Sequence, residues 1–539
     1  YGGGGGAFTA PLPTVALTKS GVPARPGMVR VEQNLFFAPF VAPAADPWVW
    51  TFLSTWFPPD PLAFDLPYLG LPTAGSVPVR IALAGGTAHT HTVEAWLNGA
   101  RVGAVTFGDL SAAEIQGTVP AGVLRQSGNV LTWAYSADVS GPDDGALAFV
   151  DLIDLGFRPD PPTAEVPVAR IAPYDPTLPA SVTRAGYLVV THALFADAAQ
   201  QIADAKGAEY RTAVLDVERA YDRYSAGVVE PNAVAALLAE AWQKSRQALR
   251  YVLLVGDDTY DPHDYSGTGQ ASFLPSLWGW DAVFGRVPSE NRFADTNGDG
   301  APELAIGRLP VVTPADADVA ADKIVRQAEL LATPSGAPLP LLAVDDPSPE
   351  DTISFYQMAA AAAGPLPHGA DALWATVAGG VGPARARLLA GLRSSAAAVH
   401  YFGHGSYEFW TDNGLLTLAD MAGLAHAGHA VAVFAWTCQA QWYQYGNEPT
   451  IDEALLLVPD GGAVACLGPA GITEPELQRV FYLEVDDNLQ AGMPLGEAVR
   501  RAKAAVLQAG GDSLRDIVDG WNLLGDPALR LYRSNSGGH

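Results

Sequence analysis

The sequence predicts an α/β protein whose mostly parallel sheet carries helices on both faces and is preceded by an all-β sandwich domain. Two observations support this prediction. Short runs of alternating apolar and polar residues fill the chain up to about residue 160, whereas strand-like and helix-like segments alternate from about residue 183. Because 539 residues exceed what one hydrophobic core usually supports, we expect several domains.

Residues 1–160 have the pattern of a β-sandwich. Runs such as VRIALAG and HTVEAWLNGARVGAVTF alternate in polarity and are separated by Gly, Pro and Asn. The pair Asn98-Gly99 between two such runs is a strong signal for a β-hairpin. The proline-rich stretch RPDPPTAEVP then predicts a linker, which we place at 161–182.

Two α/β subdomains are expected after the linker, at 183–325 and 326–539. Apolar runs such as GYLVVTH, RYVLLVGDD, AAVHYFGH and AVAVFAWTC are typical of strands buried on both faces of a parallel sheet. Ligands of such folds bind beyond the carboxyl ends of the strands. Three polar clusters follow strand-like runs and are therefore candidates for a site: GDDTYD, GHGS and TCQAQ.

The composition is acidic, with 31 Lys and Arg against 58 Asp and Glu and a formal net charge of −27. This charge disfavours nucleic acid and anionic membrane surfaces as partners. No apolar run is long enough to cross a membrane as a helix. The chain opens with YGGGGGAF instead of Met, so we interpret it as a processed mature form.

His404 and Cys438 are the candidate catalytic residues. Each follows an apolar strand-like run, and consecutive parallel strands lie side by side or nearly so, which would bring both side chains into one crevice. A cysteine thiolate is a nucleophile, and a histidine can take its proton. Gly405 would let a backbone N–H approach a substrate carbonyl, and with the N–H of Cys438 it could form an oxyanion hole.

Other interpretations of these residues compete with catalysis. His400 and His404 have the spacing of a helical zinc site, but Gly403 and Gly405 would break a helix. Cys466, the second of two cysteines, fits a small buried apolar residue, and two cysteines are no disulfide framework. No G-x-S-x-G motif is present, which argues against a serine hydrolase. A packed histidine and a buried cysteine without function would fit the composition equally well.

Seven segments in order resemble the gingipain-like family of cysteine peptidases, over residues 30 to 535. They are YLVVTH, LLVGDDTYDPHDY, FADTNGDGAPELAIGRLPV, YFGHGS, FAWTC, EALLLVPDGGAVACLGPAG and NLLGDPALRLY. The resemblance implies a caspase-like fold and a secreted enzyme, with His404 as general base or acid and Cys438 as nucleophile. It also implies that residues 1–160 form either an inhibitory prodomain or an accessory module.

The resemblance extends to acidic residues beside the dyad. Asp345 or Asp346, after the strand-like LPLLAV, would orient the imidazole, as a carboxylate does in catalytic triads. Asp351 matches the acid of the family's arginine pocket and would pair with a basic residue before the scissile bond. The alternative for Asp351 is an acid in the first turn of a helix beginning near PSPEDTISF.

The segment DTNGDGAPE is a candidate calcium site. Asp295, Asn297 and Asp299 follow the D-x-N-x-D-G order of calcium loops, but Ile306 replaces the usual glutamate, with Glu303 as the nearest substitute. The resemblance favours structural Ca²⁺, because the family binds calcium. The alternative is a turn held by Asp and Asn side chains.

We therefore expect a secreted cysteine endopeptidase acting on proteins or peptides. The run after Cys438 departs from the family, which often has glycine there, because Gln439, Gln441 and Trp442 are bulkier. This departure would alter the cleft or abolish activity. The alternative function is a structural or adhesive extracellular protein on a peptidase-like fold, assembled as a homo-oligomer, filament or surface layer.

Overall fold

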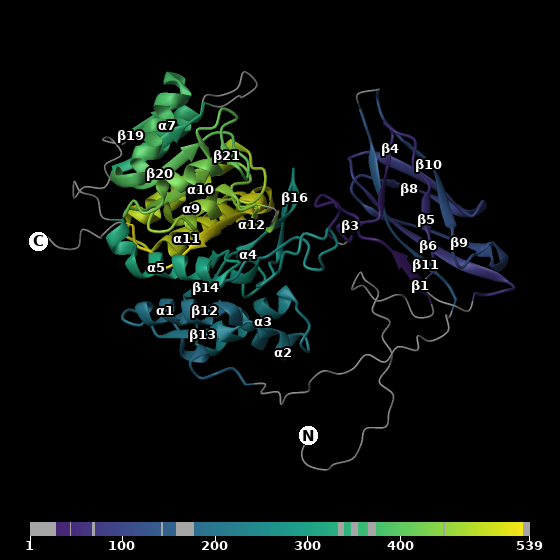
Figure 1. The fold of residues 1–539 in the computed structure, drawn as a ribbon, viewed down its shortest axis with the longest axis horizontal. Coiled ribbons are helices and arrows are strands. Elements are labelled where there is room, and N and C mark those ends of the chain that lie inside the picture. The colour runs from purple at the N-terminus through teal and green to yellow at the C-terminus, as the bar shows by residue number, and fades with distance from the viewer. Residues whose placement is uncertain are drawn as a thin grey trace, which may run out of the picture. The chain divides into compact units, whose positions relative to one another are not determined.

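The computed structural model describes residues 28–43, 45–66, 71–141, 144–157, 177–331, 339–345, 354–364, 373–445 and 448–531. The chain divides into two compact units, residues 1–171 and 172–539 (Figure 1). Most of the linker expected at 161–182 lies outside the described residues, and so do both chain ends. The division of the α/β part at residue 325 stays a prediction.

The first unit is a β-sandwich. One sheet has the order β1-β11-β6-β9, with β4 beside β11, and the other has the order β5-β10-β7-β8. The strands are β1 (Val29–Glu32), β4 (Thr51–Ser54), β5 (Leu62–Phe64), β6 (Ser76–Gly85), β7 (Thr90–Leu97), β8 (Ala100–Gly108), β9 (Ala112–Pro120), β10 (Asn129–Ala137) and β11 (Leu147–Leu155). Buried residues of both sheets, such as Ile81 and Leu131, share one core. The short strands β2 (Phe36–Phe37) and β3 (Trp48–Val49) form a separate pair.

The hairpin predicted at Asn98-Gly99 joins β7 to β8. Both residues have positive φ, 50° and 83°, as the tight turn of a two-residue hairpin requires.

The second unit is built on one ten-stranded sheet with the order β13-β12-β14-β17-β25-β24-β23-β20-β18-β19. Its strands are β12 (Tyr187–Thr191), β13 (Thr212–Asp216), β14 (Tyr251–Val255), β17 (Ala305–Leu309), β18 (Leu339–Val344), β19 (Leu373–Thr376), β20 (Ala396–Phe402), β23 (Val431–Trp436), β24 (Ala463–Pro469) and β25 (Trp521–Gly525). Pairing is parallel from β19 through β18, β20 and β23 to β24, whereas β25 runs antiparallel to β24. The sheet is therefore mostly parallel, as predicted.

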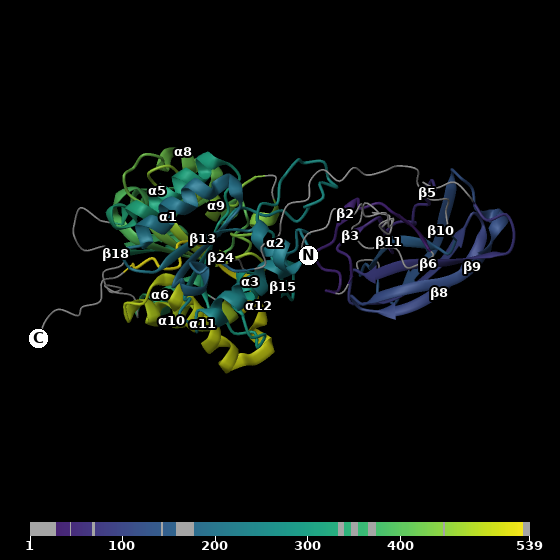
Figure 2. The ribbon, with the colours of Figure 1, turned by 90° about the horizontal axis from the view of Figure 1, so that it is seen from below.

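Helices cover both faces of this sheet (Figure 2). One face carries α1 (Ala196–Lys206), α5 (Pro314–Leu330), α7 (Val381–Ala390) and α9 (Ile451–Leu456), which share one core with the strands. The other face carries α2 (Glu218–Tyr224), α3 (Pro231–Lys244), α6 (Phe355–Ala363), α10 (Pro475–Gln490), α11 (Leu495–Gly510) and α12 (Arg515–Gly520). Local signals define several helix starts. For example, α5 begins with a capping box of Thr313 and Asp316 around Pro314.

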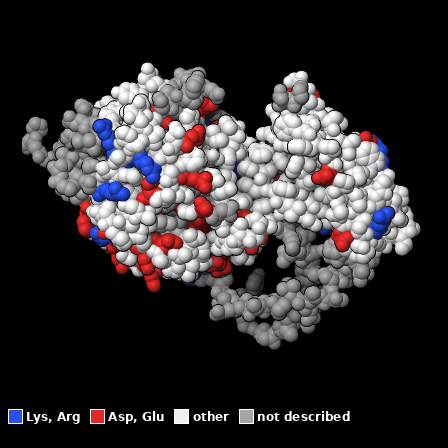
Figure 3. All heavy atoms as spheres, turned by 45° about the horizontal axis from the view of Figure 1, so that its top comes forward, with Lys and Arg blue, Asp and Glu red and all other residues white. Residues whose placement is uncertain are grey.

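The smaller elements are α4 (Glu290–Ala294), α8 (Met421–Leu424) and two hairpins. The hairpins pair β15 (Trp278–Asp281) with β16 (Gly285–Pro288) and β21 (Phe409–Trp410) with β22 (Leu416–Thr417). On the face of the α/β unit seen in Figure 3, acidic side chains are more prominent than basic ones, in line with the net charge. Across the described part of the chain, no helix combines the length and apolar character needed to span a membrane.

Candidate active site

His404 and Cys438 leave neighbouring strands at the same level. Strand β20 pairs in parallel with β23, and the register matches Phe402 with Trp436. Each candidate residue lies two positions beyond this last matched pair. The imidazole is exposed and the thiol half-buried, so both side chains are open to a ligand at the edge of the sheet.

The two glycines around His404 are required by close packing. A β-carbon at Gly403 would lie 2.3 Å from Cβ of Asp345 and 2.5 Å from the hydroxyl of Tyr401. A β-carbon at Gly405 would lie 2.6 Å from Oγ1 of Thr437, the residue before Cys438. The Gly-His-Gly motif therefore lets the His404 turn approach both the end of β18 and the strand that carries the thiol.

Asp345 holds the main chain at His404. Its Oδ2 accepts a hydrogen bond from the His404 amide at 3.3 Å, and its own amide donates to the Phe402 carbonyl at 2.9 Å. The imidazole packs edge-on against the ring of Phe355, with ring centroids 5.1 Å apart. Of the two acids expected to orient the histidine, Asp345 is thus in contact with this turn. Asp346, and also Asp351 of the expected arginine pocket, lie outside the described residues.

The amide of Gly405 points out of its hairpin. Gly405 forms an isolated antiparallel bridge with Trp410. The flanking hydrogen bonds run from the Thr411 amide to the His404 carbonyl and from the Ser406 amide to the Phe409 carbonyl. In this arrangement the bridged residues are a non-hydrogen-bonded pair, and their own N–H groups face outward. This orientation suits the predicted oxyanion donor.

Cys438 sits at the start of a sharp turn. Its Sγ lies 3.9 Å from the carbonyl oxygen of Thr473. The next residue, Gln439, has a φ of 53°, and its amide donates to the Gly471 carbonyl at 2.8 Å. Burial raises the pKa of the Cys438 thiol above its ordinary value, and the negative charges of Asp281 and Glu474 add to the rise. The thiol is therefore protonated at neutral pH and needs a base to become a nucleophile.

Buried side chains anchor the segment after Cys438. Gln441 is fully buried, and its Nε2 donates to Asp452 at 2.8 Å and to the Cys466 carbonyl at 3.1 Å. The Tyr443 hydroxyl donates to Glu290 at 2.6 Å. Gln441 is one of the bulky residues that the sequence suggested would alter the cleft. Its amide points into the protein and donates to Asp452.

Asp281 is a buried acid whose charge acts on the thiol, and the sequence alone did not single it out. Its side chain is fully buried at the end of β15, and its Oδ1 accepts hydrogen bonds from the Val283 and Phe284 amides at 2.9 and 2.6 Å. Burial raises its pKa to about 6. The signal in the sequence was a lone acid inside the apolar run LWGWDAVFG, since an acid in such a run is often buried.

The other histidine and cysteine of the site region are core residues. His400 is fully buried and stacked on Phe434 at 4.4 Å, and its Nδ1 accepts from the Trp436 indole at 3.3 Å. Burial lowers the pKa of His400 to about 3. Cys466 is fully buried, and neither cysteine forms a disulfide. These observations confirm Cys466 as a buried apolar residue and do not support zinc at His400.

The loop with the expected calcium ligands is closed by its own hydrogen bonds. Asp295 accepts from the amides of Gly298 and Gly300, at 2.7 and 2.8 Å, and Glu303 accepts from Thr296 and Asn297. Asp299 accepts from Asn297 and from the Ala301 amide. Among the described residues, three metal-binding side chains converge only at Glu32, Asp46 and Asp151 of the sandwich. The expected ligands of this loop offer oxygen atoms, which Ca²⁺ prefers, but their carboxylates do not converge on one point.

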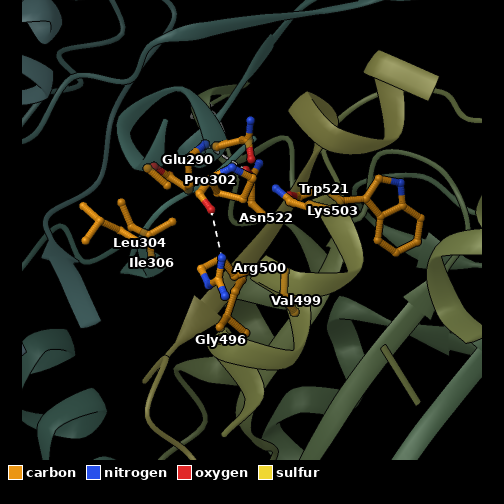
Figure 4. A pocket seen from close by; sticks show the side chains of 13 residues that line it. Glu290, Pro302, Leu304, Ile306, Gly496, Val499, Arg500, Lys503, Trp521 and Asn522 are labelled. Carbon is orange, nitrogen blue, oxygen red and sulfur yellow. Dashed lines mark hydrogen bonds between the residues drawn. The ribbon is translucent and has the colours of Figure 1, made fainter. Parts of the chain in front are cut away.

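One surface cavity lies near the dyad, and a second, much smaller one lies away from it. A cavity of about 310 Å³ lies between α6 and α10, the helices that begin beside His404 and beside Thr473, and Arg479 and Glu476 are among its lining residues. The hollow in Figure 4 lies elsewhere, between α4, α11 and β25, and is crossed by a hydrogen bond from Arg500 to the Pro302 carbonyl. Its volume of about 10 Å³ suits a single water and no ligand.

Comparison with known proteins identifies the family and the fold of the chain. A model of peptidase family C25 matches residues 180–532. The structure of the Arg-specific cysteine proteinase gingipain R is similar with a TM-score of 0.52 and 17% identity, over 65% of this chain and 78% of that one. The complex of the pro- and mature domains of RgpB from Porphyromonas gingivalis gives 0.50 and 17%, over 64% and 79%. At these identities the structural likeness shows the fold alone. No curated protein matches the sequence.

Proposed function

The chain belongs to peptidase family C25, and from that premise we propose that it is a secreted cysteine endopeptidase with Cys438 and His404 as its catalytic dyad. The observation that carries the proposal is the register of β20 and β23, from which both side chains emerge at one level. Membership of the family supports a cysteine peptidase that acts on proteins. The dyad, the secretion and the specificity are proposed here.

The reaction begins with a proton transfer. His404 takes the proton of the Cys438 thiol, and the sulfur attacks the scissile carbonyl carbon to give a tetrahedral intermediate. The outward N–H of Gly405 and the N–H of Cys438 hold the oxygen that becomes negative. The imidazolium then gives its proton to the leaving amine as the C–N bond breaks. Water, deprotonated by His404, hydrolyses the thioester and restores the thiol.

The raised thiol pKa makes the general base essential. A preformed thiolate–imidazolium pair is not favoured beside Asp281 and Glu474, whose charges disfavour the thiolate. Asp345 positions His404 by holding its backbone amide. Asp345 or Asp346 would also orient the imidazole during proton transfer.

We further propose that the residue before the scissile bond is basic. The charges of Asp281 and Glu474 act on the thiol, and a cationic side chain would be attracted to them. Asp351 is the proposed partner of that side chain. Kinetic comparison of substrates with Arg, Lys and Ala at this position tests the idea, and a preference for Ala would exclude it.

Covalent labelling tests the proposed enzyme. An acyloxymethyl ketone carrying Arg should label wild type and not Cys438→Ala, and Cys466→Ala should be labelled as wild type is, since that thiol is buried. Labelling should be repeated after limited proteolysis, because the sandwich could act as an inhibitory prodomain. Absence of labelling under both conditions, also with calcium present, would contradict the proposal.

A second candidate function is a structural or adhesive extracellular protein on this fold, assembled from copies of the chain. It is favoured by the raised pKa of the Cys438 thiol, which lowers intrinsic reactivity. Sedimentation of an unlabelled protein as a large homo-oligomer would support it. A labelled monomer would count against it.

Structural calcium at Asp295, Asn297, Asp299 and Glu303 is proposed separately. To bind the ion, the carboxylate oxygens would have to give up hydrogen bonds that they accept within the loop. Calcium should raise the melting temperature of wild type and have a smaller effect on Asp295→Asn. An equal shift in both proteins, or none in wild type, would argue against this site.

A further inference from the structure

Five aromatic rings meet at the edge of the sheet that carries the dyad. They come from four segments: the loop after β14, the turn between β15 and β16, the loop after His404, and the segment after Cys438. The rings are Tyr260, Phe284, Tyr407, Trp442 and Tyr445, here called the aromatic cluster.

The rings of the aromatic cluster contact one another directly. Phe284 meets Trp442 edge-on with centroids 4.7 Å apart, and Tyr445 lies 4.8 Å from Trp442 and 4.7 Å from Tyr407. Tyr260 stacks against Tyr445 at 6.3 Å. The loops are also joined by their main chains, because the Tyr260 amide donates to the Gln444 carbonyl at 3.0 Å.

The aromatic cluster is not part of any hydrophobic core. None of its rings belongs to the five cores formed by the described residues. Trp442 is buried with 9% exposure, whereas the other four rings are half-buried. Beside Phe284, Val283 is 62% exposed at the hairpin turn. A group of partly exposed aromatic rings that contact one another outside the hydrophobic cores is typical of a binding site.

The aromatic cluster is coupled to the nucleophile through two loops. Tyr407 follows His404 by three residues, and Trp442 follows Cys438 by four. The Phe284 turn is held by Asp281, which packs so closely on Gly471 that a β-carbon there would lie 2.3 Å from its Oδ2. The Gly471 carbonyl in turn accepts the Gln439 amide. The positions of the aromatic rings and of the thiol therefore depend on the same contacts.

Tyr260 of the aromatic cluster and Asp345 follow strands that lie on opposite sides of the two dyad strands. In the sheet, β18, which leads to Asp345, borders β20, and β23 follows. Tyr260 follows β14, on the far side of β24 from the dyad. A peptide held by its basic residue near the end of β18 would cross the dyad and reach the rings with residues from the other side of the scissile bond.

We propose that the aromatic cluster is a subsite for an aromatic or large aliphatic side chain of the substrate, located after the scissile bond. This deepens the proposed peptidase function and rests on it. Trp442 forms the buried floor of the cluster, and its indole N–H has no hydrogen-bond partner among the described residues. Glu408 and Glu448 act electrostatically on Tyr407, so an acidic side chain is disfavoured in the subsite.

Binding to the Cys438→Ala protein tests the subsite without catalysis. The probes are fluorescent peptides with one Arg, in which Phe, Ala or Asp occupies each of the following three positions in turn. At one of these positions Phe should bind about tenfold tighter than Ala, from ring packing, and Asp more weakly than Ala. The added substitutions Tyr407→Ala and Phe284→Ala should each reduce the preference for Phe.

Tyr210→Ala is the matched control. This ring packs at 5.1 Å against Tyr251, the first residue of β14, and is not part of the aromatic cluster. It should leave the preference unchanged. Equal affinity for Phe and Ala at all positions, a preference that survives both cluster variants, or no binding of any peptide would overturn the subsite. A Phe preference in a protein whose wild type is never labelled by the ketone would uphold the subsite and contradict the peptidase.

Discussion

Gly405 lies against Thr437 so closely that a methyl group on Gly405 would stand 2.6 Å from Thr437 Oγ1. This contact joins the residue after the candidate base to the residue before the candidate nucleophile. Gly405→Ala should therefore push the two loops apart and reduce peptidase activity by at least about tenfold, since small misplacements of catalytic groups are costly. The measurement is kcat/KM on an Arg peptide, together with the melting temperature.

The clash can be relieved from the other side. Thr437→Ala removes the oxygen that the new methyl would strike, so the double variant should recover much of the activity lost in Gly405→Ala. Additive losses in the double variant would show that the contact does not set the alignment.

The positions of His404 and Cys438 at the ends of neighbouring strands could be predicted because the sequence signals are local. Apolar runs defined β20 and β23, and each run ended at a residue capable of chemistry, His404 and Cys438. Right-handed connection of parallel strands then sufficed to predict that they are neighbours. The buried state of Cys466 followed from the same patterns.

Other parts of the site depend on long-range packing and escaped prediction. The side chain of Gln441 turns inward because Asp452 of α9 is buried without another hydrogen-bond donor among the described residues. Asp281 acts electrostatically on the thiol from the β15–β16 hairpin, more than a hundred residues earlier in the chain. These interactions could not be predicted from the spacing of residues in the sequence.

The thiol of Cys438 should become more acidic when a neighbouring negative charge is removed. Glu474→Gln and Asp281→Asn each remove a charge that raises its pKa, so both should shift the alkylation–pH profile to lower pH. At a fixed pH below the pKa, iodoacetamide should then react several times faster with the variants. Glu484→Gln, farther along α10, is the control and should react as wild type does. An unchanged profile in both test variants would contradict the electrostatic account.

Gln439→Gly should stabilise the protein. Gln439 has a φ of 53°, a left-handed conformation that costs a non-glycine residue about 1 kcal/mol. The variant keeps the hydrogen bond from the amide of residue 439 to the Gly471 carbonyl, so activity should not fall. Urea unfolding should show a higher midpoint for Gln439→Gly and no gain for Gln439→Ala, which keeps the strain. A gain of equal size in the alanine variant would mean that the side chain, and not the backbone, is the cause.

Asp486 should make the protein less stable as the pH rises. Its side chain on α10 is fully buried, and neither carboxyl oxygen has a hydrogen-bond partner among the described residues. Burial raises its pKa well above the usual range, so the folded chain keeps a proton that the unfolded chain loses above its ordinary pKa of 3.8. The free energy of unfolding is therefore unaffected in acid, and it decreases as the pH rises from 3.8 toward the pKa of the folded state.

Two substitutions at Asp486 separate charge from polarity. Asp486→Asn removes the titration, so its free energy of unfolding relative to wild type should increase from pH 4 to pH 8. Asp486→Leu also removes the buried polar group and should gain about 1–3 kcal/mol at pH 8. Asp487→Asn, one residue along and exposed, is the matched control and should change little at either pH. If urea unfolding gave the same difference between Asp486→Asn and wild type at both pH values, the carboxyl would have to be charged in the folded protein, and the assigned direction of its pKa would be wrong.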